Sequence, residues 1–341
     1  MTAWNPEKVR QDFVLLRNTD RVYFDNAATS QKPQCVLDAV EEFYQKYNAN
    51  VLRGLYPLSV EATERYEAAR RTVQRFIHAA CPEEIIFTRN ATESMNLVAY
   101  SYGMANLKAG DEILVSIMEH HSNILPWQMV SRATGAKLVF LECEPDGTIT
   151  KEKMDAAFSE HTRMVAVTQV SNVLGCVNDI PELVKRARAC GAAILMDAAQ
   201  SAPHMPIDVQ KLDVDFVAFS GHKMLAPMGI GVLYGKQELL EKMPPFLTGG
   251  EMIETVSRYD AVYAELPHKF EAGTVNAGGA VGLAAAIDYL ESYGMDKLHA
   301  VEQELTAYLF RGMKAIPHIH VLGSDREDNH TGIVSFAVDQ V

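Results

Sequence analysis

The chain has 341 residues, of which 48% are hydrophobic and 22% charged, which is the composition of a globular protein and excludes a disordered or fibrous one. Its formal net charge is −13, because 44 acidic residues outnumber 31 Lys and Arg. That charge argues against nonspecific binding to nucleic acid or to an anionic membrane surface.

The length predicts two domains, since a domain usually has about 150 residues. Residues 1–10 are polar, so we expect no secretory signal peptide, and no apolar run approaches the ~20 residues of a membrane span. The five cysteines form no CxxC motif and lie far apart, at Cys35, Cys81, Cys143, Cys176 and Cys190. An odd number of scattered cysteines fits a reducing compartment, so we predict a cytoplasmic protein.

Strand-like and helix-like patterns alternate through the middle of the chain. The predicted strands are 85–87, 112–117, 137–141, 164–169, 193–196, 216–219 and 231–234. The predicted helices are 92–104, 151–160 and one that Pro181 opens and Gly191 ends. This alternation predicts an α/β fold with a mostly parallel sheet covered by helices on both faces. No helix separates the last two strands, so we expect one of them to be antiparallel.

The pattern changes after Gly250. A loop rich in charged and aromatic residues, 251–269, leads to a long helix at 280–293 that Gly294 ends. A second helix and strands at 319–322 and 332–338 follow. We interpret this part as a smaller α+β domain.

Two short motifs together indicate a cofactor. Lys223 ends the run Phe219-Ser220-Gly221-His222-Lys223, a small turn that can hold an amine in place to react with an aldehyde. Asp197 ends an apolar strand, where a buried carboxylate can pair with a pyridinium nitrogen. These are the two groups that pyridoxal 5'-phosphate (PLP) requires. Each motif alone would indicate a surface lysine or a helix-capping aspartate, whereas the pair favours PLP.

The chain resembles the fold-type-I PLP enzymes of aminotransferase class V, and within them the SUF-type cysteine desulfurases and selenocysteine lyases. The resemblance rests on four segments, 22–28 (VYFDNAA), 118–127 (MEHHSNILPW), 220–223 (SGHK) and 270–274 (FEAGT). It implies a fold-type-I transferase with a seven-stranded sheet in a large PLP-binding domain, 21–265. It also implies a small α+β domain built from 1–20 with 266–341. We expect this small domain to be truncated, because the family places its catalytic cysteine and a carboxylate-binding arginine further along the chain.

The activity implied by the resemblance is conversion of L-cysteine to L-alanine. The sulfur is passed on as a persulfide for iron–sulfur cluster assembly, and selenocysteine lyase activity on L-selenocysteine is a related expectation. The implied partners are a second copy of the chain, in a homodimer, and a sulfur-acceptor protein. The alternative is a PLP-binding fragment or pseudoenzyme without turnover, since the catalytic-cysteine segment is expected beyond Val341.

Three residues are candidate ligands of the PLP phosphate. Thr92 follows the first predicted strand and begins a helix, where free N–H groups and the helix dipole favour an anion. A simple N-cap is the alternative for Thr92. The resemblance assigns Thr92, Ser220 and His222 to the phosphate.

His120 and His121 are expected at a strand end, where adjacent side chains point to opposite sides, so we predict no metal pair and no metal site. The resemblance implies that His120 lies on the PLP ring and acts in proton transfer, beside the catalytic residues Lys223 and Asp197. A structural histidine is the alternative. Asn172 follows a strand, and its amide can donate to a substrate carboxylate or to the ring oxygen. Gln200, three residues after Asp197, resembles the family's donor to the ring oxygen. Ordinary loop amides are the alternative for both.

Arg53 and Thr274 resemble residues that the family contributes across a dimer interface, Arg53 toward the substrate and Thr274 toward the cofactor. Leu52 stands where the family often has histidine, and a solvated arginine at a helix start is an equal alternative for Arg53. None of the five cysteines lies where the family has its persulfide cysteine. Cys176 is expected to be a small apolar residue packed under the site.

Overall fold

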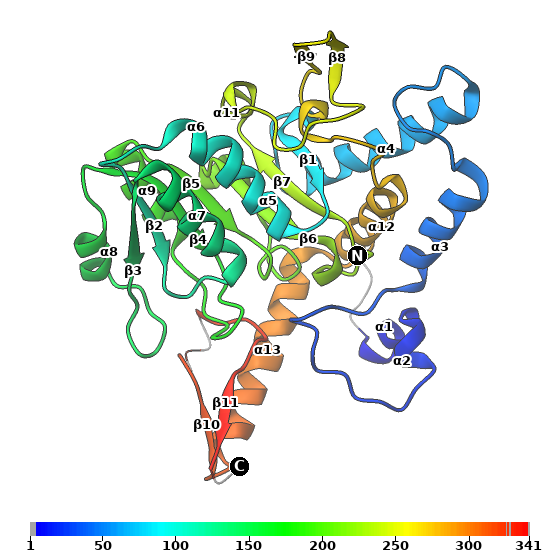
Figure 1. Ribbon diagram of the computed structural model, residues 1–341. Helices are drawn as coiled ribbons and strands as arrows, with labels where there is room; N and C mark the ends of the chain where they lie inside the picture. The colour runs from blue at the N-terminus through cyan, green and yellow to red at the C-terminus, as the bar shows by residue number, and fades with distance from the viewer. Residues whose placement is uncertain (1–4, 325, 327–328, 340–341) are drawn as a thin grey trace. The chain divides into compact units, whose positions relative to one another are not determined.

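The computed structural model describes residues 5–324, 326 and 329–339. Residues 1–4, 325, 327, 328, 340 and 341, which belong to the predicted small domain, lie outside the described residues. The main sheet has seven strands in the order β1-β7-β6-β5-β4-β2-β3 (Figure 1). Its strands are β1 (Ile85–Thr88), β2 (Glu112–Ser116), β3 (Lys137–Leu141), β4 (Thr162–Thr168), β5 (Ala193–Asp197), β6 (Phe216–Ser220) and β7 (Gly231–Gly235).

Parallel pairing predominates in this sheet. β2 pairs in parallel with β3 and with β4, and β4 pairs in parallel with β5. β7 is antiparallel to β1, with Ile85 opposite Tyr234. Every residue of β1, β5, β6 and β7 is buried, as expected for strands covered on both faces. The predicted α/β class, with a mostly parallel seven-stranded sheet, is confirmed.

The chain divides into two compact units. The first contains the described residues up to Leu97, with 207–210 and 218–294, and the second contains 98–206, 211–217 and the described residues from Met295 onward. The predicted boundaries, 21–265 against 1–20 with 266–341, stay a prediction.

The first unit has a helical layer in which α12 packs against both α4 and α3. Its helices are α1 (Pro6–Asp12), α2 (Val14–Arg17), α3 (Gln34–Glu42), α4 (Pro57–Phe76), α5 (Ala91–Leu97), α11 (Gln237–Lys242) and α12 (Ala277–Tyr293). α12 is rich in Gly and Ala because its neighbours are close: a Cβ on Gly282 would lie 2.7 Å from side-chain atoms of Pro227 and Val40. The long helix that Gly294 ends is confirmed.

A β-hairpin lies in the first unit where the sequence predicted only a loop at 251–269. Its strands, β8 (Ile253–Val256) and β9 (Ala261–Tyr263), pair antiparallel around a turn in which Ser257 N donates to Asp260 O over 2.7 Å (Figure 1). Both strands are short and mostly exposed, so they lack the buried apolar alternation that identifies a strand in sequence. The prediction of a loop over the whole of 251–269 was therefore wrong.

In the second unit, α9 (Ile180–Cys190) packs on β4 and β5, and α7 (Leu125–Thr134) packs on β3. Gly191 ends α9 with φ of 72°, a left-handed conformation that glycine adopts without strain. α8 (Lys151–Ala157) ends before the predicted residue 160. α13 (Met295–Lys314) packs on β10 (Ile319–Val321), which pairs antiparallel with β11 (Phe336–Val338). α10 (Val209–Leu212) lies between β5 and β6 in the chain.

The predicted helix at 92–104 is interrupted. α5 ends at Leu97, a π-helical turn covers Val98–Gly103, and α6 (Met104–Asn106) follows. A π-helical turn adds a residue to the helical repeat without removing apolar residues, so the periodicity of the sequence does not reveal it. Continuous α-helix was therefore the wrong prediction here.

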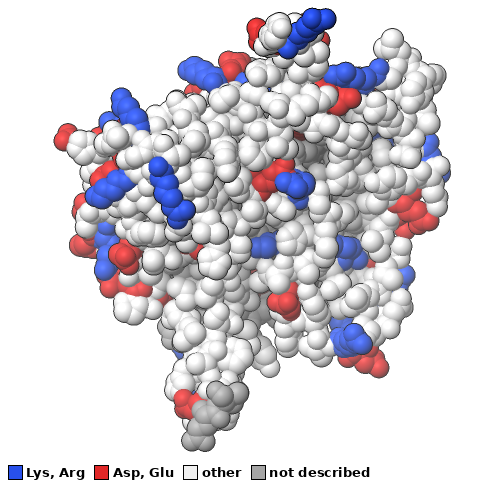
Figure 2. Space-filling model, in the orientation of Figure 1, with Lys and Arg blue, Asp and Glu red and all other residues white. Residues whose placement is uncertain are grey.

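Acidic and basic side chains are interspersed on the face of the molecule drawn in Figure 2. No continuous basic stripe of the kind that binds nucleic acid is visible on that face. Within the described ranges, no helix combines the length and the apolar character that crossing a membrane requires.

Candidate active site

Asp197 and Gln200, two of the predicted cofactor residues, lie in one buried turn of the second unit. Asp197 is the last residue of β5, is only 4% exposed, and accepts a hydrogen bond from Ala199 N over 2.8 Å. Its register partner on β4 is Thr168. Gln200, three residues later, is equally buried. The carboxyl end of a parallel strand is where α/β proteins place their ligands.

Glu119 is a buried acid of this unit that the sequence reasoning missed. Its carboxylate accepts hydrogen bonds from Thr168 N over 2.8 Å, from Asn123 Nδ2 over 2.6 Å and from Ser116 Oγ. Burial, with a smaller contribution from the charge of Asp197, raises its pKa to about 8 despite the lowering effect of these hydrogen bonds. Glu119 therefore joins the ends of β2 and β4 beside Asp197. The only signal in the sequence is an acid directly after the apolar Met118.

His120 does not lie at a strand end, so the expected alternation of His120 and His121 was wrong. β2 ends at Ser116, and His120 is the N-cap of a 3-10 turn over His121–Asn123. The two imidazole rings lie 5.9 Å apart at 43°, both exposed. Ser122 N donates to His120 Nδ1 over 3.2 Å, so the neutral ring has its proton on Nε2. Across the described part of the chain, no group of three or more His, Cys, Asp or Glu is arranged to hold a metal ion.

Asn172 is half-buried in the turn after Ser171, in the second unit. Cys176, four residues later, is 1% exposed, and its Sγ lies 3.7 Å from Met118 Sδ. Burial raises the pKa of Cys176 to about 11. Its expected role as a packed apolar residue agrees with this burial.

Other thiols of the chain also have raised pKa values. Burial raises the pKa of Cys81 to about 11 and raises the pKa of Cys35 and Cys143 as well. Reactive cysteines have lowered pKa values instead, because the thiolate is the nucleophile. Cys35, Cys81, Cys143 and Cys176 are therefore poor candidates for a nucleophile.

Lys223 and its neighbours lie in a short turn of the first unit. Ser220 ends β6, and Gly221–Lys223 form a 3-10 turn. Ser220 Oγ accepts a hydrogen bond from Ala91 N, the first residue of α5, over 2.8 Å. Thr92 is the next residue of α5 and is exposed. The structure thus connects two of the predicted phosphate ligands, Ser220 and Thr92, through Ala91.

The segment Thr29–Lys32 contacts this turn and was also missed by the sequence reasoning. The carbonyl oxygen of His222 lies within hydrogen-bond distance of Thr29 Oγ1, Ser30 N, Ser30 Oγ and Lys32 Nζ, at 3.2, 3.0, 3.1 and 3.0 Å. Burial lowers the pKa of Lys32 to about 8. Burial also lowers the pKa of His222, and the charges of Lys223 and Lys32 lower it further. The segment directly follows the 22–28 motif in the sequence.

Arg53 does not lie at a helix start, and its side chain is 50% exposed. α4 begins only at Pro57, and Arg53 Nε lies 2.8 Å from the carboxylate of Glu251 in an ion pair of the first unit. Leu52 and Glu251 both have left-handed backbone, with φ of 78° and 69°, which is strained for residues other than glycine. The segment before Thr274 reaches the same place, because Gly273 N donates to Gly250 O over 2.9 Å. Thr274 itself is exposed.

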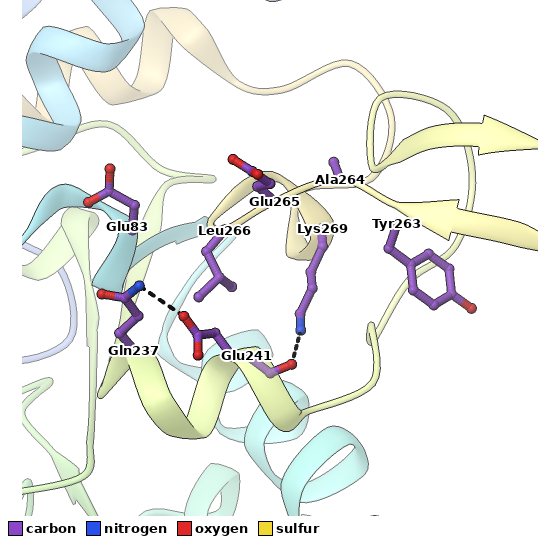
Figure 3. Close-up of a pocket in the computed structure, with 8 residues that line it drawn as sticks. All are labelled: Glu83, Gln237, Glu241, Tyr263, Ala264, Glu265, Leu266 and Lys269. Carbon is purple, nitrogen blue, oxygen red and sulfur yellow. Dashed lines mark hydrogen bonds between the residues drawn. The ribbon is translucent and has the colours of Figure 1, made fainter.

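A cavity of about 570 Å³ in the first unit lies away from these residues. It is lined by Glu83, Gln237, Glu241, Tyr263, Ala264, Glu265, Leu266 and Lys269 (Figure 3). Lys269 Nζ donates to Glu241 O over 2.9 Å, near the end of α11. None of the predicted site residues lines this cavity, so it is not the candidate cofactor site.

Comparison with known proteins gives matches over nearly the whole chain. A curated protein of Synechocystis sp. named probable cysteine desulfurase is 51% identical over 335 residues, which are 97% of this chain and 80% of the relative. One of the same name from Halalkalibacterium halodurans is 52% identical over 320 residues, 94% of this chain and 78% of the relative. The apo structure of the cysteine desulfurase from Thermococcus onnurineus NA1 superposes with a TM-score of 0.95 at 42% identity, covering 100% of this chain and 84% of that one.

The family model described as aminotransferase class-V matches residues 22–341. That range includes the predicted cofactor and substrate residues of both units, from Arg53 to Thr274. The chain therefore belongs to the aminotransferase class-V family.

Proposed function

We propose that the protein is a PLP-dependent cysteine desulfurase, which converts L-cysteine to L-alanine and passes the sulfur on. The observation on which this depends most is the buried Asp197 at the end of β5. The same chain has Lys223 on the turn after β6. About half of its residues are identical to those of relatives named probable cysteine desulfurase.

The residues present fit PLP by their chemistry. A buried carboxylate such as Asp197 suits a cationic ring nitrogen, and the amine of Lys223 suits the aldehyde. Ser220, His222 and Thr92 offer donors for the phosphate, and Gln200 and Asn172 offer amides for the ring oxygen and the substrate. Thr274 would reach the cofactor of the second copy in a homodimer. Lys223, Asp197 and His120 are the residues that we propose as catalytic.

Bound PLP supplies an electron sink for the bond broken at the substrate Cα. Asp197 would hold the proton on the ring nitrogen. Lys223 would take the proton from the substrate Cα and return it, which requires a neutral amine. His120 would move a proton through Nε2, because Ser122 N–H occupies Nδ1. Arg53 would pair with the substrate carboxylate, and its ion pair with Glu251 would orient it.

The sulfur step requires a thiolate close to the substrate sulfur. The raised pKa values of Cys35, Cys81, Cys143 and Cys176 disfavour a persulfide on any of these four thiols. A sulfur-acceptor protein, use of L-selenocysteine, a homodimer and a cytoplasmic location belong to this proposal as predictions from the sequence.

The test is to load the protein with PLP, add L-cysteine and a dithiol, and measure L-alanine and sulfide. The dithiol reduces the released sulfur to sulfide and becomes a disulfide, so the two products are expected in equal amounts. Lys223→Ala should abolish both, whereas Lys185→Ala, which changes an exposed lysine, should not. Bound PLP without any alanine would refute a desulfurase and support the alternative, a PLP-binding protein without turnover.

A further inference from the structure

The peptide bond directly before Lys223 has an unusual number of donors around its carbonyl oxygen. This oxygen, of His222, faces the Ser30 amide, the Thr29 and Ser30 hydroxyls and the Lys32 ammonium, all within 3.2 Å. A carbonyl oxygen has two lone pairs, so four converging donors more than satisfy it. One of them is a cation, and hydrogen bonds from charged donors are the stronger kind.

The same segment also holds the residues after Lys223. Ser30 Oγ accepts a hydrogen bond from Leu225 N over 2.8 Å. Within the turn, Met224 N and Ala226 N both donate to Gly221 O, and Gly221 N donates to Ile230 O. The backbone is therefore fixed on both sides of Lys223. Ser30 contacts the chain both before and after Lys223, at His222 O and Leu225 N.

Lys32 is placed in a way that packing alone does not explain. It is half-buried at the wall of a cavity of about 440 Å³, whose lining is both apolar (Val14, Leu15, Leu37) and polar (Asn18, Thr19, Arg21, Gln31). Its amine donates to the carbonyl oxygens of Ser30 and His222 and does not simply extend into water. Burial of an ammonium group lowers its pKa, as found here, and is unfavourable unless the charge is used. A methionine of similar length would fill the same space without that cost.

We propose that Ser30 and Lys32 are positioning residues for Lys223, which fix the turn before and after it and so hold its amine ready to react with the cofactor aldehyde. The role of Lys223 in this proposal rests on the proposed function, whereas the contacts that Ser30 and Lys32 make with its turn do not depend on that function. Because the turn is already ordered, Lys223 loses less conformational freedom when it reacts with the cofactor.

The test uses Ser30→Ala, Lys32→Met and the conservative Lys32→Arg, with Lys46→Met, an exposed lysine of the same unit, as the matched control. The first readout is amide hydrogen exchange of the protein without PLP. In Ser30→Ala and Lys32→Met, amides at 221–226 should exchange at least tenfold faster while those of β1 and β7 are unchanged. Lys32→Arg and the control should stay within threefold of the wild type.

The second readout is the rate at which added PLP forms its covalent link with Lys223, followed by absorbance. Lys32→Met should slow it about tenfold, and Lys32→Arg should restore it. Unchanged exchange at 221–226 in Lys32→Met and Ser30→Ala would overturn the positioning role, as would acceleration spread evenly over β1 and β7. If the wild type forms no link on Lys223, the proposed function fails, while the exchange experiment still decides whether Ser30 and Lys32 fix the turn.

Discussion

Arg70 and Glu271 form a fully buried ion pair in the first unit, and replacing Arg70 should destabilise the protein strongly. The Arg70 side chain is 0% exposed, and its two terminal nitrogens lie 2.7 and 2.8 Å from the Glu271 oxygens. Glu271 also accepts from Phe87 N and from the hydroxyl of Tyr66. The pair thereby joins α4 and β1 to the 270–274 segment that ends at Thr274.

The Arg70→Met substitution leaves the Glu271 carboxylate buried without its guanidinium partner, with Phe87 N and the Tyr66 hydroxyl as donors and the His268 ring 3.8 Å away. Breaking a buried pair in this way costs about 3–5 kcal/mol. Glu271→Gln should cost less, roughly 1.5–3 kcal/mol, because Arg70 keeps a second carboxylate, Glu67, at 2.9 Å. The matched control is Arg75→Met on the same helix. Arg75 pairs with Asp288 and Glu291 but is 54% exposed, so its loss should cost at most about 1 kcal/mol.

The pH dependence of stability provides a second check on this pair. Burial alone would raise the pKa of Glu271, but the charge of Arg70 and several hydrogen bonds hold it at about 2. A carboxyl group whose pKa is lower in the folded than in the unfolded protein stabilises the fold at pH values above its unfolded pKa, which is near 4.5. It loses that contribution as the pH falls toward 2. The assay is urea unfolding at neutral pH and across this acid range. If Arg70→Met costs no more than Arg75→Met, or leaves the acid dependence unchanged, the reasoning fails.

Three other predictions concern the site and the assembly. The pKa of Glu119 is raised to about 8, so the stabilisation that protonated Glu119 gives the fold is complete below about pH 4.5 and is lost as the pH rises to 8. Glu119→Gln should remove this pH dependence of the unfolding free energy, and an unchanged slope would contradict the reasoning. Asp197→Asn should still bind PLP but form alanine about 100-fold more slowly or worse, because an amide does not keep the ring nitrogen protonated; a normal rate with PLP bound would count against the assignment. Light scattering should give about twice 37.8 kDa, and a monomer that binds PLP normally would argue against shared sites at Arg53 and Thr274.

The fold was predictable where local signals are strong. β3 has its predicted bounds, and Pro181 and Gly191 mark the ends of α9 to within one residue. The π-helical turn at 98–103 and the β8–β9 hairpin were not predictable, because neither changes the apolar periodicity that identifies a helix or a strand. Local sequence describes the interior of an element better than the way it is connected to the next one.

The site residues also differ in whether local sequence could predict them. Lys223 and Asp197 belong to short motifs that indicate their chemistry, so the sequence identified both as candidates. The roles of Glu119, Ser30 and Lys32 depend on contacts made only in the fold: Ser30 and Lys32 meet His222 across 192 and 190 positions. Arg70 and Glu271 are separated by 201 positions. No spacing rule in the sequence predicts pairs of this kind.

Mapping the covalent PLP adduct tests the central claim most directly. The protein is loaded with PLP, reduced with borohydride and digested, and the modified peptide is identified by mass spectrometry, with Lys223→Ala as the control. Reaction should leave the cofactor on Lys223, within the turn that follows β6, and the Lys223→Ala protein should be colourless. An adduct on another lysine, or a yellow Lys223→Ala protein that is trapped equally well, would contradict the proposed site.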